Sequence, residues 1–137
     1  SDFWFMAGTI QVEIKSIKVG RYMIMNGIAC KITKLDFSKP GKHGHAKFRI
    51  EGISLTDGTK HIEVMPGHEK VDSPIIDKKS AQVLSVHESV ANVMDAETYE
   101  TFDLKIPEEL VGKVHEGDNV LYWIILDDKV LMEVKGG

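Results

Sequence analysis

Short runs in which apolar and polar residues alternate, separated by tight turns, cover the first half of the chain. Alternation with a period of two is typical of strands that bury one face. Asn26-Gly27, flanked by apolar runs, predicts a type I′ hairpin turn, and Asp57-Gly58 predicts a second tight turn. The predicted strands are 11–15, 22–25, 28–37, 46–55 and 61–65. Five short strands without a helix predict a small SH3-like barrel over residues 1–70.

The second half again has the pattern of short strands, with one interruption. Pro107, followed by Glu108 and Glu109, predicts a short helix, because proline and acidic residues favour a first helical turn. The predicted strands are 79–86, 89–94, 98–104, 120–126 and 130–134. Three strands, a short helix and a closing hairpin predict an OB fold over residues 73–137, so the whole chain is expected to be all-β.

The boundary between these domains is expected between residues 65 and 75, where Pro66-Gly67 and Ser73-Pro74 occur and the charge balance changes.

Tyr122 and Trp123 are neighbours in a predicted strand, so one should be buried and the other at the surface. Stacking of Tyr122 on a base remains open, although ordinary packing is favoured.

The net charge of −4 conceals an asymmetry between the halves. Residues 1–71 contain eleven Lys and Arg and seven Asp and Glu, which gives +4, whereas residues 72–137 contain six and fourteen, which gives −8. The cations of the first half cluster at Lys31, Lys34, Lys39, Lys42, Lys47 and Arg49. This cluster suits a phosphate backbone, and the acidic half does not.

Composition excludes several classes of protein. No apolar run approaches the roughly 20 residues of a membrane span, and the apolar start, residues 1–6, lacks the basic region of a signal peptide. Cys30 is the only cysteine and lies on the apolar face of a predicted strand, so we expect a buried thiol and a reducing, cytoplasmic location. Phe3, Trp4 and Phe5 could form a self-association patch if exposed, and they are assigned no role.

Residues 38–45 form the expected tip of a β-hairpin, and these eight residues exceed the roughly 2–5 of ordinary hairpin loops. Pro40-Gly41 is a turn dipeptide, and a positive φ is expected at Gly41 and at Gly44. Lys42, between these glycines, should point outward. Long loops on rigid hairpins are where function tends to lie, although most Lys- and Gly-rich loops are only solvated turns.

The loop sequence Ser-Lys-Pro-Gly-Lys-His-Gly-His-Ala-Lys, residues 38–47, closely resembles the signature loop of the archaeal and eukaryotic translation factor 5A family. The resemblance continues at residues 71–76, 78–83 and 94–101, and covers nearly the whole chain from about Gln11 onward. The N-terminal residues 1–6 depart from the family's usual start. In that family the lysine that corresponds to Lys42 is converted to deoxyhypusine or hypusine. The family's C-terminal domain is also an OB fold.

The resemblance implies a ribosome-binding translation factor. Deoxyhypusine synthase, using spermidine and NAD, would extend Lys42, which would then reach the P-site tRNA and promote peptide-bond formation at stalls and in termination. It implies no bound cofactor, no small-molecule substrate and no membrane partner. The loop residues expected to contact RNA, the ribosome or the modifying enzyme are Ser38, Lys39, Pro40, Gly41, His43, Gly44, His45, Lys47 and Arg49.

Other sites fit the sequence less well. A P-loop would need glycine where Asp36 stands and Ser or Thr where His43 stands, and the flanks of Gly41–Gly44 lack the helices of a KH loop. His43 and His45 could supply only two metal ligands, so metal binding is a weak alternative. An exposed Lys42 lacks the burial that activates a catalytic lysine and should act by contact, so the protein is not expected to be an enzyme. A general RNA-binding or RNA-chaperone protein without the modification remains the alternative function.

Overall fold

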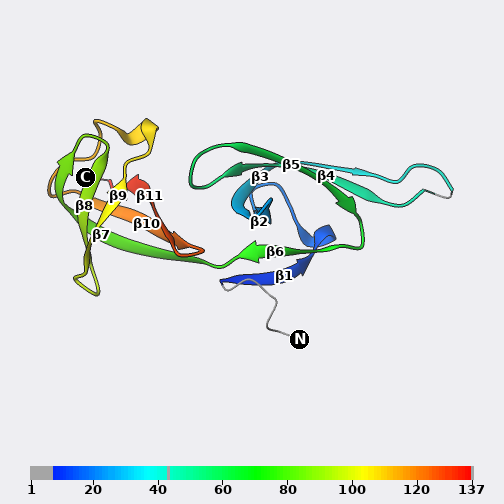
Figure 1. The fold of residues 1–137 in the computed structure, drawn as a ribbon, viewed down its shortest axis with the longest axis horizontal. Coiled ribbons are helices and arrows are strands. Elements are labelled where there is room, and N and C mark those ends of the chain that lie inside the picture. Colours follow the sequence, from blue (N-terminus) through cyan, green and yellow to red (C-terminus); the bar gives the residue numbers. More distant parts are fainter. Residues whose placement is uncertain (1–7, 43, 137) are drawn as a thin grey trace. The chain divides into compact units, whose positions relative to one another are not determined.

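The computed structural model describes residues 8–42 and 44–136, and nearly all of its regular structure is β-strand (Figure 1). The chain divides into two compact units between Ile75 and Ile76. Phe3, Trp4 and Phe5 lie outside the described residues. In the part of the chain that is described, no helix is both long and apolar enough to cross a membrane.

The first unit contains an antiparallel sheet of four strands in the order β2-β3-β4-β5 and a ribbon of two strands, β1 and β6. The elements are β1 (Thr9–Glu13), the 3-10 helix η2 (Ile14–Ser16), β2 (Tyr22–Met25), β3 (Ile28–Ser38), β4 (Lys47–Ser54), β5 (Lys60–Pro66) and β6 (Lys70–Pro74). All five strands expected in the first half are present within a few residues. The first of them ends at Glu13 rather than at residue 15, because the backbone turns into η2.

Strand β6 was not expected from the sequence. It pairs with β1 in an antiparallel register that places Val71 opposite Val12 and Ser73 opposite Ile10. Residues 73–75, which the pattern assigned to the second domain, therefore belong to the first unit. The reason is that β6 finds its partner about 60 residues earlier in the chain, a distance over which local alternation carries no information.

One apolar cluster forms the core of the first unit. Its buried members are Ile14, Ile17, Met23, Met25, Cys30, Ile32, Phe48, Ile50 and Val71. Cys30 is fully buried, and this burial raises the pKa of its thiol, which confirms the prediction of a core cysteine. The turn at Asn26-Gly27 has φ of 52° and 79°, as a type I′ turn requires.

The second unit is one antiparallel sheet in the order β11-β10-β7-β8-β9. Its strands are β7 (Ile76–His87), β8 (Val90–Asp95), β9 (Thr101–Lys105), β10 (Asn119–Ile125) and β11 (Asp128–Val134). The helix expected after Pro107 is only the single 3-10 turn η3 (Glu108–Leu110). The two curled sheets confirm the all-β fold class, an SH3-like barrel followed by an OB-fold barrel.

Tyr122 is the buried member of the Tyr122–Trp123 pair, whereas Trp123 is half-buried rather than at the surface, with Lys78 Nζ 4.9 Å from its ring centroid. Tyr122 is only 3% exposed, so it cannot stack on a base, and its hydroxyl donates a hydrogen bond to Asp95 Oδ2. Asp95 Oδ1 in turn accepts the backbone N–H groups of Glu97 and Thr98, both at 2.8 Å. The hydrogen bond from Tyr122, with those from the backbone, lowers the pKa of Asp95 to about 2. This buried pair fixes the turn between β8 and β9.

Replacing Tyr122 by phenylalanine is expected to destabilise the second unit by about 1–3 kcal/mol at pH 7, because a buried carboxylate loses its donor. The pKa of Asp95 is depressed in the folded state, so the stability it contributes is present above pH 4 and is lost as the pH falls through about 2. The difference in the free energy of unfolding between wild type and Tyr122→Phe should therefore shrink as the pH falls from 4 to 2. Urea unfolding at several pH values measures it, with exposed Tyr99→Phe as control; an equal difference at pH 7 and pH 2.5 would contradict the account.

Each unit has its own core, so residues 76–137 are expected to fold alone. The fragment should give a dispersed amide spectrum and a cooperative thermal transition. A fragment that starts at Ser73 should gain no stability, because residues 73–75 lose their partners in residues 8–10. An undispersed spectrum of residues 76–137 would show that the units depend on each other.

Candidate functional site

The β3–β4 hairpin forms an arm that carries the loop at its free end (Figure 1). Its strands stay paired as far as Ser38 opposite Lys47, beyond the last core residue on the arm, Phe48. Strand β5 continues beside β4 to the same level, where Pro66 lies opposite Lys47. The loop is therefore held by three strands at its base.

The segment Pro66-Gly67 braces the loop, although the sequence indicated part of a domain linker there. The Gly67 N–H donates a hydrogen bond of 2.8 Å to the Ala46 carbonyl. A Cβ on Gly67 would lie 2.9 Å from the Ala46 Cβ, so only glycine allows this approach without movement. The contact fixes where the second half of the loop leaves the sheet.

The two loop glycines have different structural roles. Gly41 has a φ of +63°, which confirms the positive φ expected there, and open space surrounds its Cα. Gly44 closes the loop, and a Cβ added to it would lie 1.4 Å from the Pro40 carbonyl oxygen. Gly44 is thus required because the backbone approaches itself; its φ lies outside the left-handed region, so the positive φ expected there is wrong.

Three lysines of the loop region are exposed: Lys39, Lys42 and Lys47. None of them forms an ion pair with any residue that the structure describes. Ser38, Pro40 and His45 are exposed around them, while His43 lies outside the described residues. Within residues 8–42 and 44–136, no three His, Cys, Asp or Glu side chains are grouped as a metal site would need.

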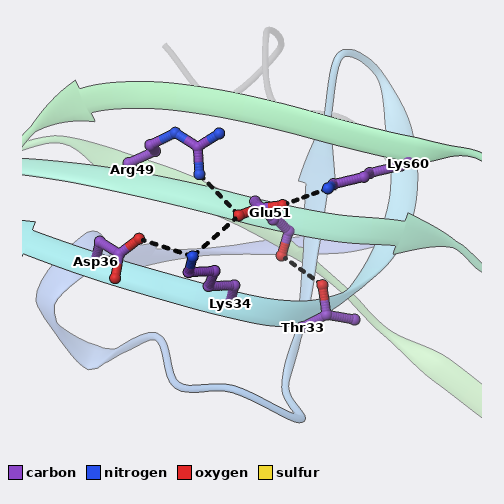
Figure 2. A network of polar contacts seen from close by, with 6 residues as sticks. All are labelled: Thr33, Lys34, Asp36, Arg49, Glu51 and Lys60. Atoms are coloured by element: carbon purple, nitrogen blue, oxygen red, sulfur yellow. Dashed lines mark hydrogen bonds and ion pairs between the residues drawn. The ribbon is translucent and has the colours of Figure 1, made fainter.

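Arg49 differs from these lysines, because it is engaged by Glu51 (Figure 2). Glu51 is only 7% exposed; its Oε2 lies 2.7 Å from Arg49 Nη1 and its Oε1 lies 2.6 Å from Lys60 Nζ. Lys34 Nζ lies 3.9 Å from both Glu51 Oε2 and Asp36 Oδ2. The hydrogen bonds from Lys60 and Arg49 lower the pKa of Glu51 to about 2, so the carboxylate is charged at neutral pH.

The Glu51 cluster, defined here as Lys34, Arg49, Glu51 and Lys60, changes the electrostatic interpretation of the arm. One carboxylate shared by three cations lowers the positive charge at the root of the arm without cancelling it, and Lys39, Lys42 and Lys47 add cations without an ion pair to a described residue farther out. Sequence reasoning included Arg49 among the RNA contacts and missed Glu51. The signal was available, since Arg49 and Glu51 are two residues apart on one strand and so share a face.

Comparison with known proteins gives a consistent result across the chain. A family model described as "Translation initiation factor 5A-like, N-terminal" matches residues 7–69. Translation initiation factor 5A of Methanosphaera stadtmanae is 47% identical over 125 residues, which cover 91% of this chain and 95% of that protein. The protein of the same name from Pyrococcus furiosus is 42% identical over 135 residues, with 96% and 98% covered. The chain belongs to the translation initiation factor 5A family.

Solved structures of the family agree with the fold. The structure titled "Eukaryotic translation initiation factor 5A from Methanococcus jannaschii" superposes with a TM-score of 0.87 at 39% identity, and covers 95% of this chain and 97% of its own. A family protein from Naegleria fowleri gives 0.78 at 28% identity, with 95% and 100% covered. The chain is therefore a translation factor of this family, and both units take part in the match.

Proposed function

We propose that this translation factor acts at the ribosome through a deoxyhypusine or hypusine side chain on Lys42. The observation that carries the proposal is the position of Lys42: it is exposed at the tip of an arm braced by three strands, and no described residue pairs with its charge. Family membership supports the same lysine as the modified one. A lysine held outward in this way is accessible first to a modifying enzyme and then to RNA.

Modification would lengthen the side chain and add a second amine without removing positive charge. Deoxyhypusine synthase would supply the aminobutyl group from spermidine with the help of NAD, and the chain itself would need no bound cofactor. The extended side chain is thin and cationic, so it can enter an RNA-walled channel that the folded arm cannot. In this proposal the channel leads from the ribosomal E site to the acceptor end of the P-site tRNA.

The contribution to peptide transfer would be positional. The ribosome performs the chemistry, and the factor holds the tRNA end in a productive geometry, which reduces the entropy cost of the reaction at stalls and in termination. The chain would not itself be an enzyme, and its site of action would be the cytoplasm, with the ribosomes.

Mass spectrometry of the protein from its native cells tests the modification directly. An added aminobutyl group, located on Lys42 by peptide fragmentation, is the expected result. An unmodified Lys42 in native protein would overturn the proposal and favour the alternative of a general RNA-binding or RNA-chaperone protein. Protein produced in bacteria without the synthase serves as the unmodified mass standard.

Ribosome binding should weaken with salt, and the loop lysines should carry the dependence. Each phosphate contact contributes a slope of roughly −0.7 to −0.9 in a plot of log affinity against log salt. Lys39→Glu combined with Lys47→Glu should lower the affinity and make the slope shallower by up to about 1.4–1.8. Sedimentation binding at four or more salt concentrations measures both quantities.

A variant in the Glu51 cluster should change the salt slope in the opposite direction. Glu51→Gln frees Arg49 and Lys60 from their carboxylate, so it should make the slope steeper, while exposed Glu69→Gln should leave it nearly unchanged. Glu108→Lys with Glu109→Lys in the acidic unit should also have little effect. A slope that responds to the second-unit variants and not to the loop variants would place the main RNA contact in the OB-fold unit.

A further inference from the structure

The arm exposes an aromatic side chain that neither the core nor the loop requires. Phe37 is 59% exposed and lies opposite Phe48 in the register of β3 and β4. The two ring centroids are 5.0 Å apart and the ring planes are inclined by 51°. Phe48 is buried at the edge of the core, so it supports one side of Phe37 and leaves the remainder of the ring open.

The exposure of Phe37 follows from the sheet. Strand β2 pairs with β3 only from Ile28 to Lys31, so among the described residues no strand pairs with the outer side of β3 at the level of Phe37. On the inner side, Phe37, Phe48 and Met65 stand opposite one another across three strands. This row places one side of the Phe37 ring against Phe48 at the edge of the arm.

The surroundings of Phe37 indicate what it contacts. Lys39 follows Phe37 by two residues and is exposed, without an ion pair to any described residue. Lys47, which lies opposite Ser38 in the next register pair, is equally unpaired but belongs to the other face of the sheet. An open aromatic ring beside an uncompensated cation is the combination by which proteins hold unpaired nucleic-acid strands, with cations on phosphates and rings on bases. An apolar contact with a protein partner would explain the exposure of the ring, but it would not use the adjacent positive charge.

We propose that Phe37 stacks on an unpaired nucleobase of the RNA that the arm approaches, while Lys39 contacts a flanking phosphate. The proposal rests on the proposed ribosome binding and adds a binding residue to it. Phe37 would fix the register of the arm on the RNA, and so the distance from that base to Lys42.

The experiment compares ribosome binding of full-length, Lys42-modified protein carrying Phe37→Ala, Phe37→Leu or Phe37→Trp, with purified archaeal ribosomes as the probe. Stacking on one base is worth about 1–3 kcal/mol by alanine substitution, which converts to roughly 5- to 150-fold weaker binding for Phe37→Ala. Phe37→Leu keeps apolar surface but lacks a ring, so it should bind as weakly as Phe37→Ala. Phe37→Trp should bind at least as tightly as wild type.

Two further readouts separate this proposal from its rivals. The salt slope should be unchanged in all three variants, because no charge is altered. Val64→Ala is the matched control, since Val64 is 61% exposed on β5 opposite Arg49, and it should bind like wild type. Thermal melts should show that the variants are folded. If Phe37→Ala alone is unfolded, the affinities of Phe37→Leu and Phe37→Trp decide between stacking and its rivals.

If Lys42→Arg weakens ribosome binding but Phe37→Leu binds with the affinity of the wild type, the stacking proposal is overturned and the proposed function is left intact. A photo-reactive phenylalanine analogue at position 37 should crosslink to ribosomal RNA; crosslinks only to ribosomal protein would equally overturn it. Absence of wild-type binding to ribosomes would remove the proposed function, and stacking with it.

Discussion

Lys42→Arg is expected to abolish the function of this factor while leaving the fold unchanged. Arginine keeps the positive charge, but its guanidinium cannot accept the aminobutyl group that a lysine amine accepts. Lys42 is exposed and makes no ion pair with a described residue, so the stability change should stay within about 0.5 kcal/mol. Complementation of cells depleted of their own factor measures function, and a thermal melt of the purified variant measures stability.

Lys39→Arg provides the matched control, because it makes the same replacement three residues earlier in the same exposed loop. It should complement fully, since charge alone is required of a residue that contacts phosphate. Normal growth with Lys42→Arg would show that charge also suffices at Lys42, and the modification would then be dispensable. Loss of growth with both variants would point to a requirement for lysine shape throughout the loop.

Sequence patterns predicted the features of this protein that depend on neighbouring residues. Alternation placed the strands of both units to within a few residues, and Asn26-Gly27 identified its turn because both residues tolerate a positive φ. The exposed loop followed from Pro40, Gly41 and the absence of apolar side chains. Each of these inferences needs only local geometry.

Features that depend on distant partners were missed. The pairing of β6 with β1, the brace between Gly67 and Ala46, and the ion pair between Glu51 and Lys60 each join separate parts of the chain. The closing hairpin was predicted, but its turn lies at Leu126 and Asp127, with φ of 47° and 73°, and leucine rarely takes a positive φ. Tertiary pairing imposes these conformations, so a pattern read along one segment does not contain them.

The two loop glycines show how such missed contacts change a prediction. Sequence reasoning treated Gly41 and Gly44 alike, as positions that need a positive φ. The structure separates them: at Gly41 a side chain meets only backbone strain, whereas at Gly44 a Cβ would overlap the Pro40 carbonyl oxygen. Strain at one residue costs about 1–2 kcal/mol, but a Cβ cannot lie 1.4 Å from an oxygen, so the loop must rearrange.

Gly44→Ala is therefore expected to slow modification of Lys42 by on the order of 100-fold, because a rearranged loop presents the amine about an ångström or more from its productive position. Gly41→Ala should slow it far less, and Gly41→Asn should be nearly normal, since asparagine tolerates a positive φ. Intact-mass kinetics with purified deoxyhypusine synthase, spermidine and NAD measures all three. The melting temperature should change little in each variant, because the loop lies beyond the core. Equal rates for Gly44→Ala and Gly41→Ala would show that the synthase reshapes the loop on binding, and that the approach of Gly44 to Pro40 does not set the position of Lys42.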